Sequence, residues 1–283
     1  MNADWLLLIV PGLIWGASFL FIAEGLRSIG PNGLTFVRIL VGFATLSLFA
    51  SARKPVGRDG WRSIGWLGLL WFAFPLSLFP FAEQRVSSAL TGMLNGANPL
   101  FATLIASYLT RRAPSRGVAV GLAVGLAGTV LMAVPASREG RSSMVGVAMV
   151  LVAMTSYGFA LSIARSLQQR YGAMPVIWRA QGLALILTAP FGIPDLLVAH
   201  WTPGPLLPLF ALGAFGTAIA NVLMASAAGR FGAARASGTL FLIPVVALVL
   251  GVVVRHEQVA LLSLAGGVIC LAGAWLMKRD SAR

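Results

Sequence analysis

The sequence is poor in charge and above all in acidic residues. Its 283 residues include 8 Asp and Glu against 21 Lys and Arg, and 10% of the chain is charged, where soluble domains average about 25%. A soluble fold of this length could not cover its surface with so few charges, which excludes a cytosolic enzyme, a secreted scaffold and a disordered chain. We therefore predict a polytopic membrane protein.

Cysteine and histidine are almost absent as well. The single Cys270 excludes a disulfide framework, and His256-Glu257 lacks the second histidine of a zinc motif. Both lysines lie outside the apolar stretches, which excludes a buried Schiff base, and no glycine-rich nucleotide motif is present. We expect no metal, no cofactor and no catalytic residues.

Long apolar stretches dominate the chain, which is 58% hydrophobic with a mean hydropathy of +0.87. A helix needs about 20 apolar residues to cross a bilayer. Stretches of this kind predict an all-α protein with ten transmembrane helices, at residues 5–23, 32–51, 63–82, 88–109, 116–135, 144–164, 175–195, 205–227, 233–254 and 258–277.

The net charge of +13 would suggest nucleic acid in a soluble protein, but basic residues in short membrane loops set orientation instead. With the N-terminus inside, the inner loops hold 14 of the 21 Lys and Arg, the outer loops hold 5, and Arg38 and Arg179 lie within spans. We expect both termini in the cytoplasm and no nucleic-acid partner.

The two halves of the chain resemble each other, which predicts repeats at residues 1–138 and 139–283. At offsets of 141 to 145 residues, matched pairs include Trp15-Gly16 with Tyr157-Gly158, Gly30 with Gly172, Arg38 with Arg179, Arg85 with Arg230, Pro99 with Pro244 and Gly128 with Gly273. Five spans are an odd number, so the second copy is inverted, as in many transporters. The alternative is a duplicated scaffold without transport.

Polar and aromatic residues in mid-span are candidates for a substrate path, because polar groups there usually face a cavity or a partner helix. Thr91, Asn95 and Asn98 share one face of the fourth span. The full candidate set is Trp15, Ser18, Phe19, Ser77, Phe79, Thr91, Asn95, Asn98, Tyr157, Phe159, Ser162, Asn221, Met224 and Thr239. Hydrogen bonding between helices and plain core packing are the alternatives.

Three further features bear on mechanism. Arg38 and Arg179 could capture a carboxylate, although snorkelling toward the nearer surface is the preferred interpretation. Glycines on the fifth and tenth spans favour close helix packing, as scaffold or as a dimer surface. The carboxylates, including Glu83 and Glu257, fall at span ends or in loops. A proton antiporter usually uses a buried acid, so we predict facilitated transport.

Trp15-Gly16, the segment from Pro31 to Arg38, and Ala97-Asn98-Pro99 resemble the EamA-domain proteins of the drug/metabolite transporter superfamily over nearly the whole chain. The sequence is most similar to YddG-type exporters. One departure is that Arg111-Arg112 stands where relatives often carry Gly-Glu, whereas His256-Glu257 keeps the acid in the tenth span.

This resemblance implies a bacterial inner-membrane protein, a monomer or homodimer, that exports small metabolites by alternating access. The implied substrates are aromatic and other neutral amino acids. Multidrug or other metabolite efflux and, as a different class, lipid scrambling are the alternatives.

Overall fold

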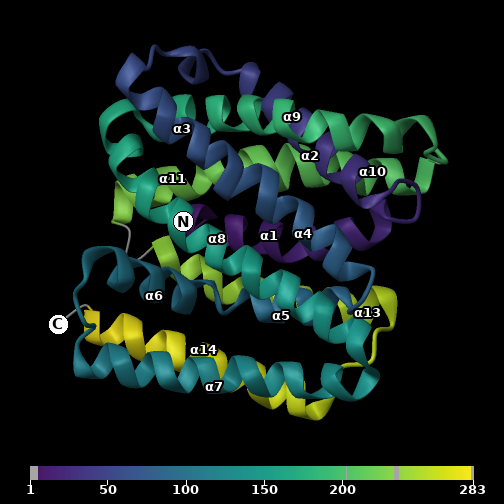
Figure 1. Cartoon of the computed structure of the whole chain (residues 1–283), viewed down its shortest axis with the longest axis vertical. Coiled ribbons are helices and arrows are strands. Elements are labelled where there is room, and N and C mark those ends of the chain that lie inside the picture. The colour runs from purple at the N-terminus through teal and green to yellow at the C-terminus, as the bar shows by residue number, and fades with distance from the viewer. Residues whose placement is uncertain (1–5, 202, 233–235, 282–283) are drawn as a thin grey trace.

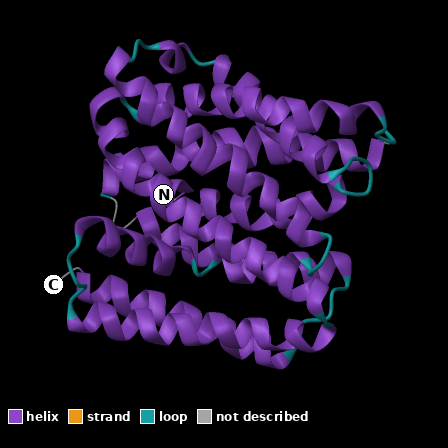
Figure 2. Ribbon diagram, viewed as in Figure 1, coloured by secondary structure: helices purple, strands orange, loops and turns teal. Residues whose placement is uncertain are grey.

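The computed structural model describes residues 6–201, 203–232 and 236–281, and these fold into helices with no strand among them (Figures 1 and 2). The α-helices are α1 (Leu6–Gly25), α2 (Pro31–Ser47), α3 (Trp61–Leu67), α4 (Phe74–Glu83), α5 (Ser88–Asn95), α6 (Asn98–Thr110), α7 (Arg116–Glu139), α8 (Arg141–Tyr171), α9 (Ala173–Leu197), α10 (Pro203–Ala211), α11 (Ala220–Phe231), α13 (Leu242–Arg255) and α14 (Leu261–Ser281). The all-helical prediction is confirmed for the described residues.

Among the described residues, eight helices are long and apolar enough to cross a membrane, and they coincide with eight of the ten predicted spans. The other two predicted spans correspond to α2, which has 17 residues, and to α5 and α6, which are separated by Gly96 and Ala97. The expected starts of the first and ninth spans, at residues 5 and 233, lie outside the described residues. The count of ten stays a prediction.

Proline accounts for two of the interruptions in the helices. A proline has no backbone N–H and cannot donate to the carbonyl four residues earlier. Pro99 follows the break between α5 and α6, and Pro75 follows a π-helical segment, Gly68–Ala73, that joins α3 to α4. A second π-helical segment, Leu212–Ile219, joins α10 to α11. Such segments open the backbone ladder and are frequent at functional sites.

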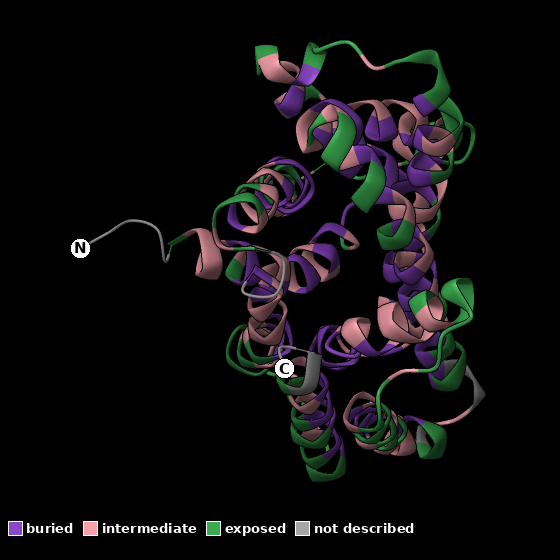
Figure 3. Cartoon of the chain, turned by 90° about the vertical axis from the view of Figure 1, so that its left-hand side faces the viewer, coloured by how far each residue is buried: buried purple, intermediate pink, exposed green. Residues whose placement is uncertain are grey.

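The helices form a bundle in which segments from the two halves alternate. α2 packs on α9, α1 packs on α11 and α13, α8 packs on α4 and α6, and α7 packs along α14 at one edge. Figure 3 shows the buried residues concentrated where these helices face each other. The consequence is that α1, α4, α5 and α8 converge in the interior, where most of the candidate residues lie.

Local features recur between the halves, which supports the predicted repeat. Arg111 ends α6 and His256 ends α13, and both adopt a left-handed conformation with φ of 52° and 55°. The two π-helical segments begin at Gly68 and Leu212, and their separation in the sequence is similar to that between Arg111 and His256. The helix packing is also reciprocal between the halves. Helix α1 of the first half packs on α11 and α13 of the second half, and α8 of the second half packs on α4 and α6 of the first.

The glycines of α7 and α14 pack these helices against each other within the chain. A Cβ atom on Gly128 would lie 2.3 Å from the backbone nitrogen of Cys270, and one on Gly273 would lie 2.3 Å from that of Gly125. Small residues of this kind let membrane helices approach closely. The predicted scaffold role fits this geometry, whereas a dimer surface on these helices stays a prediction.

We expect Gly128→Ala to destabilise the bundle by about 1–3 kcal/mol, because the new methyl group overlaps backbone rather than a flexible side chain. Thermal unfolding in detergent measures the effect as a lower Tm. Gly65→Ala is the matched control, since a Cβ there meets nothing within 4 Å. Equal Tm values for the two variants would contradict the close α7–α14 packing.

Candidate functional site

An aromatic wall lines the interior between α1, α4 and α8. The rings of Phe19 and Phe79 meet edge to face with centroids 5.7 Å apart, and Phe79 lies 6.2 Å from the ring of Tyr157. Phe19 and Phe79 are 4% and 3% exposed. Three of the predicted residues from three helices are thus brought together, and their faces suit an apolar or aromatic group.

Two amides lie where α5 breaks and α6 begins. Asn95 ends α5 and Asn98 begins α6. Each side-chain oxygen, Oδ1, is buried and has no hydrogen-bond partner in the described part of the chain. A buried acceptor without a partner is costly, so these two oxygens are available to a donor such as an ammonium group.

Arg38 lies in α2 and is buried, with 6% exposure. Its Nε donates to the hydroxyl of Thr217 at 2.8 Å, while its terminal nitrogens make no hydrogen bond to any described residue. The preferred sequence interpretation, in which Arg38 snorkels to the surface, is therefore wrong. The reason is that the second π-helical segment presents Thr217 as an internal partner.

Thr217 is the centre of a polar network around that segment. Its carbonyl accepts from Gln181 Nε2 at 2.7 Å and from Asn221 Nδ2 at 3.0 Å, and its hydroxyl donates to the carbonyl of Leu212. Asn221 is thus buried as predicted, but its amide nitrogen is used by the π-helical segment that precedes α11. Gln181 keeps its Oε1 buried without a partner in the described residues.

Four of the predicted residues already have hydrogen-bond partners within the protein. Trp15 donates its indole N–H to the carbonyl of Gly216 at 3.0 Å, which ties α1 to the second π-helical segment. Thr239 donates to the carbonyl of Leu8 in α1. Ser18 and Thr91 are buried but donate to carbonyls of their own helix or its cap. These four hydroxyl or indole groups are already satisfied.

The remaining candidates are not gathered with the wall. Ser162 is exposed and donates to the carbonyl of Gly158, and half-buried Ser77 donates to that of Ala73. Phe159 and Met224 are also half-buried, with no ring contact or hydrogen bond among the described residues.

One acid that the sequence placed at a span end has an unexpected environment. Glu83 is the last residue of α4, yet both of its carboxylate oxygens are buried without a partner among the described residues. Its charge interacts with those of Arg38, Arg255 and Glu257. The sequence could indicate Arg38 as a candidate because it is a charged residue inside a predicted span. No sequence pattern indicated the burial of Glu83.

Ion pairs close the end of the bundle at which α1 and α13 finish, which we call the Glu24 end. Arg255 bonds Glu24 at 2.5 Å and Glu257 at 3.1 Å. Glu257 also accepts from the backbone N–H and hydroxyl of Ser88 and from the N–H of Ala89. This network joins α1, α13 and α5.

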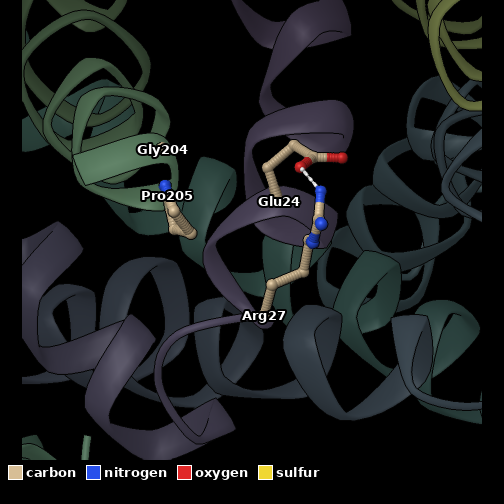
Figure 4. Close-up of a pocket in the computed structure, with 4 residues that line it drawn as sticks. All are labelled: Glu24, Arg27, Gly204 and Pro205. Atoms are coloured by element: carbon tan, nitrogen blue, oxygen red, sulfur yellow. Dashed lines mark hydrogen bonds and ion pairs between the residues drawn. The ribbon is translucent and has the colours of Figure 1, made fainter. Parts of the chain in front are cut away.

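Beside this network, a hollow of about 380 Å³ lies between α1 and α10, lined by Glu24, Arg27, Gly204 and Pro205 (Figure 4). Arg27 bonds Glu24 at 2.9 Å across its rim. Charged groups at the rim place this hollow at the surface of the bundle rather than at the aromatic wall.

The opposite end, which we call the Asp59 end, is held differently. Asp59 accepts from Tyr171 at 2.9 Å and pairs with Arg170 at 2.6 Å, both exposed. Arg179 lies over the rings of Trp61 and Trp178 and bonds the carbonyl of Ala52. Among the described residues, no ion pair joins α1, α5 and α13 at this end.

Comparisons with known proteins agree with this architecture. The EamA-like transporter family matches residues 4–134 and 144–279. The chain is 27% identical to the "Uncharacterized transporter YdfC" of Bacillus subtilis, over 92% of this chain and 86% of that protein. One solved crystal structure shares the fold over 100% of both chains, with a TM-score of 0.65 and 18% identity.

Two further relatives carry more specific names. The chain is 26% identical to a "Probable terminal-alkyne amino-acid exporter" of Streptantibioticus cattleyicolor, over 98% of this chain and 94% of that protein. It is 24% identical to a "Probable amino-acid metabolite efflux pump" of Salmonella typhimurium, over 96% and 94%. These names indicate transport rather than enzymatic catalysis.

Proposed function

The chain belongs to the EamA-like transporter family, and from this membership we propose that it exports aromatic and other neutral amino acids across a bacterial inner membrane. In this proposal ten spans form an inverted five-plus-five repeat, divided near residue 138, with both termini in the cytoplasm. The two halves expose a central site alternately to each side, as inverted repeats do in other transporters.

The observation that carries the proposal is a pair of buried amide oxygens without a partner among the described residues, on helices that pack against those of an aromatic wall. The terminal nitrogens of Arg38 suit a carboxylate, because a guanidinium binds carboxylates bidentately. The side-chain oxygens of Asn95 and Asn98 suit an ammonium group. Phe19, Phe79 and Tyr157 suit an apolar side chain. Together these groups match a zwitterionic amino acid.

The Glu24-end network supports a closed state on that side. Arg255 and Glu257 tie α13 and α5 to α1 there, whereas no such ion pair joins these helices at the Asp59 end in the described residues. With both termini in the cytoplasm, the Glu24 end faces outward and the described state is closed to the outside. Opening then requires these pairs to separate.

Flux of radiolabelled amino acids into proteoliposomes tests the proposal. We expect saturable uptake of several neutral amino acids that unlabelled phenylalanine inhibits. Absence of flux for every amino acid, from protein that elutes as a single folded species, would overturn the substrate class. Uptake of cationic drugs, or lipid scrambling in the same vesicles, would then identify the alternative.

We expect Asn98→Ala to lower amino-acid flux by on the order of tenfold, because the substrate ammonium loses a buried acceptor. The same flux assay measures the effect. Asn32→Ala is the matched control, since Asn32 lies in the first turn of α2 near its end. If both variants transport equally well, Asn98 holds helices together rather than substrate.

A further inference from the structure

We infer that Glu83 exchanges a proton for the ammonium group of the substrate and so couples transport to the proton gradient. This inference rests on the proposed function, because it assumes an amino-acid substrate in the same interior. It replaces the facilitated transport that the sequence predicts. That prediction considered only how far along the spans the acidic residues lie. The structure also shows which groups surround the carboxylate of Glu83.

Glu83 forms no ion pair with any described residue, although the charges of Arg38 and Arg255 act on it from a distance. Both of its oxygens are buried and accept no hydrogen bond from any described residue. The other acid nearby, Glu257, accepts from Ser88, Ala89 and Arg255. Glu24 and Glu257 at this end pair with Arg255, whereas Glu83 has no partner among the described residues.

Three charges act on Glu83, namely those of Arg38 in α2, of Arg255 at the end of α13, and of Glu257 after it. Of the elements packed on α4, α8 also carries Tyr157, which lies near Arg38, and α1 carries Glu24. Arg85 follows Glu83 by two residues and donates to the carbonyl of Phe81. The first π-helical segment and α5 contribute no charged or titratable group.

The cations in this set are already engaged. Arg255 is shared between two acids, Glu24 and Glu257. Arg38 is anchored on Thr217 through Nε and has its terminal nitrogens left for the substrate carboxylate. Arg85 donates to the carbonyl of Phe81, and among the described residues no cation pairs with the carboxylate of Glu83.

A buried carboxylate without a partner is costly in its charged form, so it holds a proton until a cation arrives. In this cycle the substrate ammonium is the cation that reaches Glu83. When it binds, the Glu83 carboxyl group loses one proton to the solution on the open side and pairs with the ammonium as a carboxylate. When the substrate leaves on the other side, one proton returns. Each cycle exchanges one proton for one substrate molecule.

Proteoliposomes test this exchange with radiolabelled phenylalanine under two conditions. Under an imposed gradient of about one pH unit, we expect the wild-type flux of phenylalanine in the direction opposite to the proton flow to rise by on the order of tenfold. We expect Glu83→Gln to lose this rise. At equal pH, we expect Glu83→Gln to keep exchange of external for internal phenylalanine. Asp59→Asn, an exposed acid at the opposite end, is the matched control and is expected to respond as wild type does.

Proton release provides a second measurement that a merely structural role would not change. Adding phenylalanine to wild-type protein in weakly buffered detergent is expected to release up to one proton per bound molecule, and Glu83→Gln is expected to release none. Gradient-driven flux in Glu83→Gln would overturn the inference, as would wild-type flux that ignores the gradient. Loss of exchange at equal pH in folded Glu83→Gln would also overturn it. Absence of any wild-type amino-acid flux would instead refute the proposed function.

Discussion

Replacing Arg38 by Gln is expected to reduce amino-acid flux by about 100-fold or more, the largest effect of any single substitution in the interior. Removing one partner of a desolvated, charge-assisted pair costs roughly 2–5 kcal/mol, since the other charge is left without compensation. Here that other charge is the substrate carboxylate, which the terminal nitrogens of Arg38 are proposed to bind. Initial flux of radiolabelled phenylalanine in proteoliposomes measures the loss.

The predicted repeat supplies a matched control for this experiment. Arg179 lies at the corresponding position of the second half, but it bonds the carbonyls of Ala52 and Pro175 near the Asp59 end. We therefore expect Arg179→Gln to keep flux within a few-fold of wild type. Arg38→Lys keeps the charge but not the planar fork, and we expect it to recover only part of the flux. If Arg38→Gln transports normally, the guanidinium serves the bundle and not the substrate.

The sequence predicted the helical fold well because the bilayer imposes strict requirements on length and polarity. What it could not predict was where helices would deviate from regular geometry. The proline signals at Pro75 and Pro99 marked two interruptions, but the π-helical segment around Thr217 has no proline in it. That segment creates the internal partner of Arg38, and without it snorkelling was the reasonable expectation.

The candidate site was predicted in part for a similar reason. Spacing on a helix tells which residues share a face, and the wall of Phe19, Phe79 and Tyr157 lies where such faces meet. Spacing does not tell which polar groups are satisfied by their own backbone, as Ser18 is. It also does not tell that the last residue of a span, Glu83, turns inward. Both properties depend on contacts between distant segments.

Arg255→Gln is expected to open the Glu24 end and to raise the labelling rate of an interior reporter by about 10- to 100-fold. Among the described residues, Arg255 is the one cation that bonds both Glu24 and Glu257, so its loss leaves two partly buried acids facing each other. Such a loss is worth roughly 1–3 kcal/mol for groups that keep some exposure, and each 1.4 kcal/mol shifts a two-state population tenfold.

A cysteine at Ser18 reports on this opening through its reaction with a membrane-impermeant maleimide added from the Glu24 side. The native Cys270 is buried against Thr129 between α7 and α14, which keeps its background labelling low. Arg170→Gln is the matched control, because its pair with Asp59 is exposed at the opposite end and such surface pairs contribute little. We expect that control to label within about twofold of the reporter alone. Equal labelling of Arg255→Gln and Arg170→Gln would show that helix packing alone, and not this ion-pair network, keeps the Glu24 end closed.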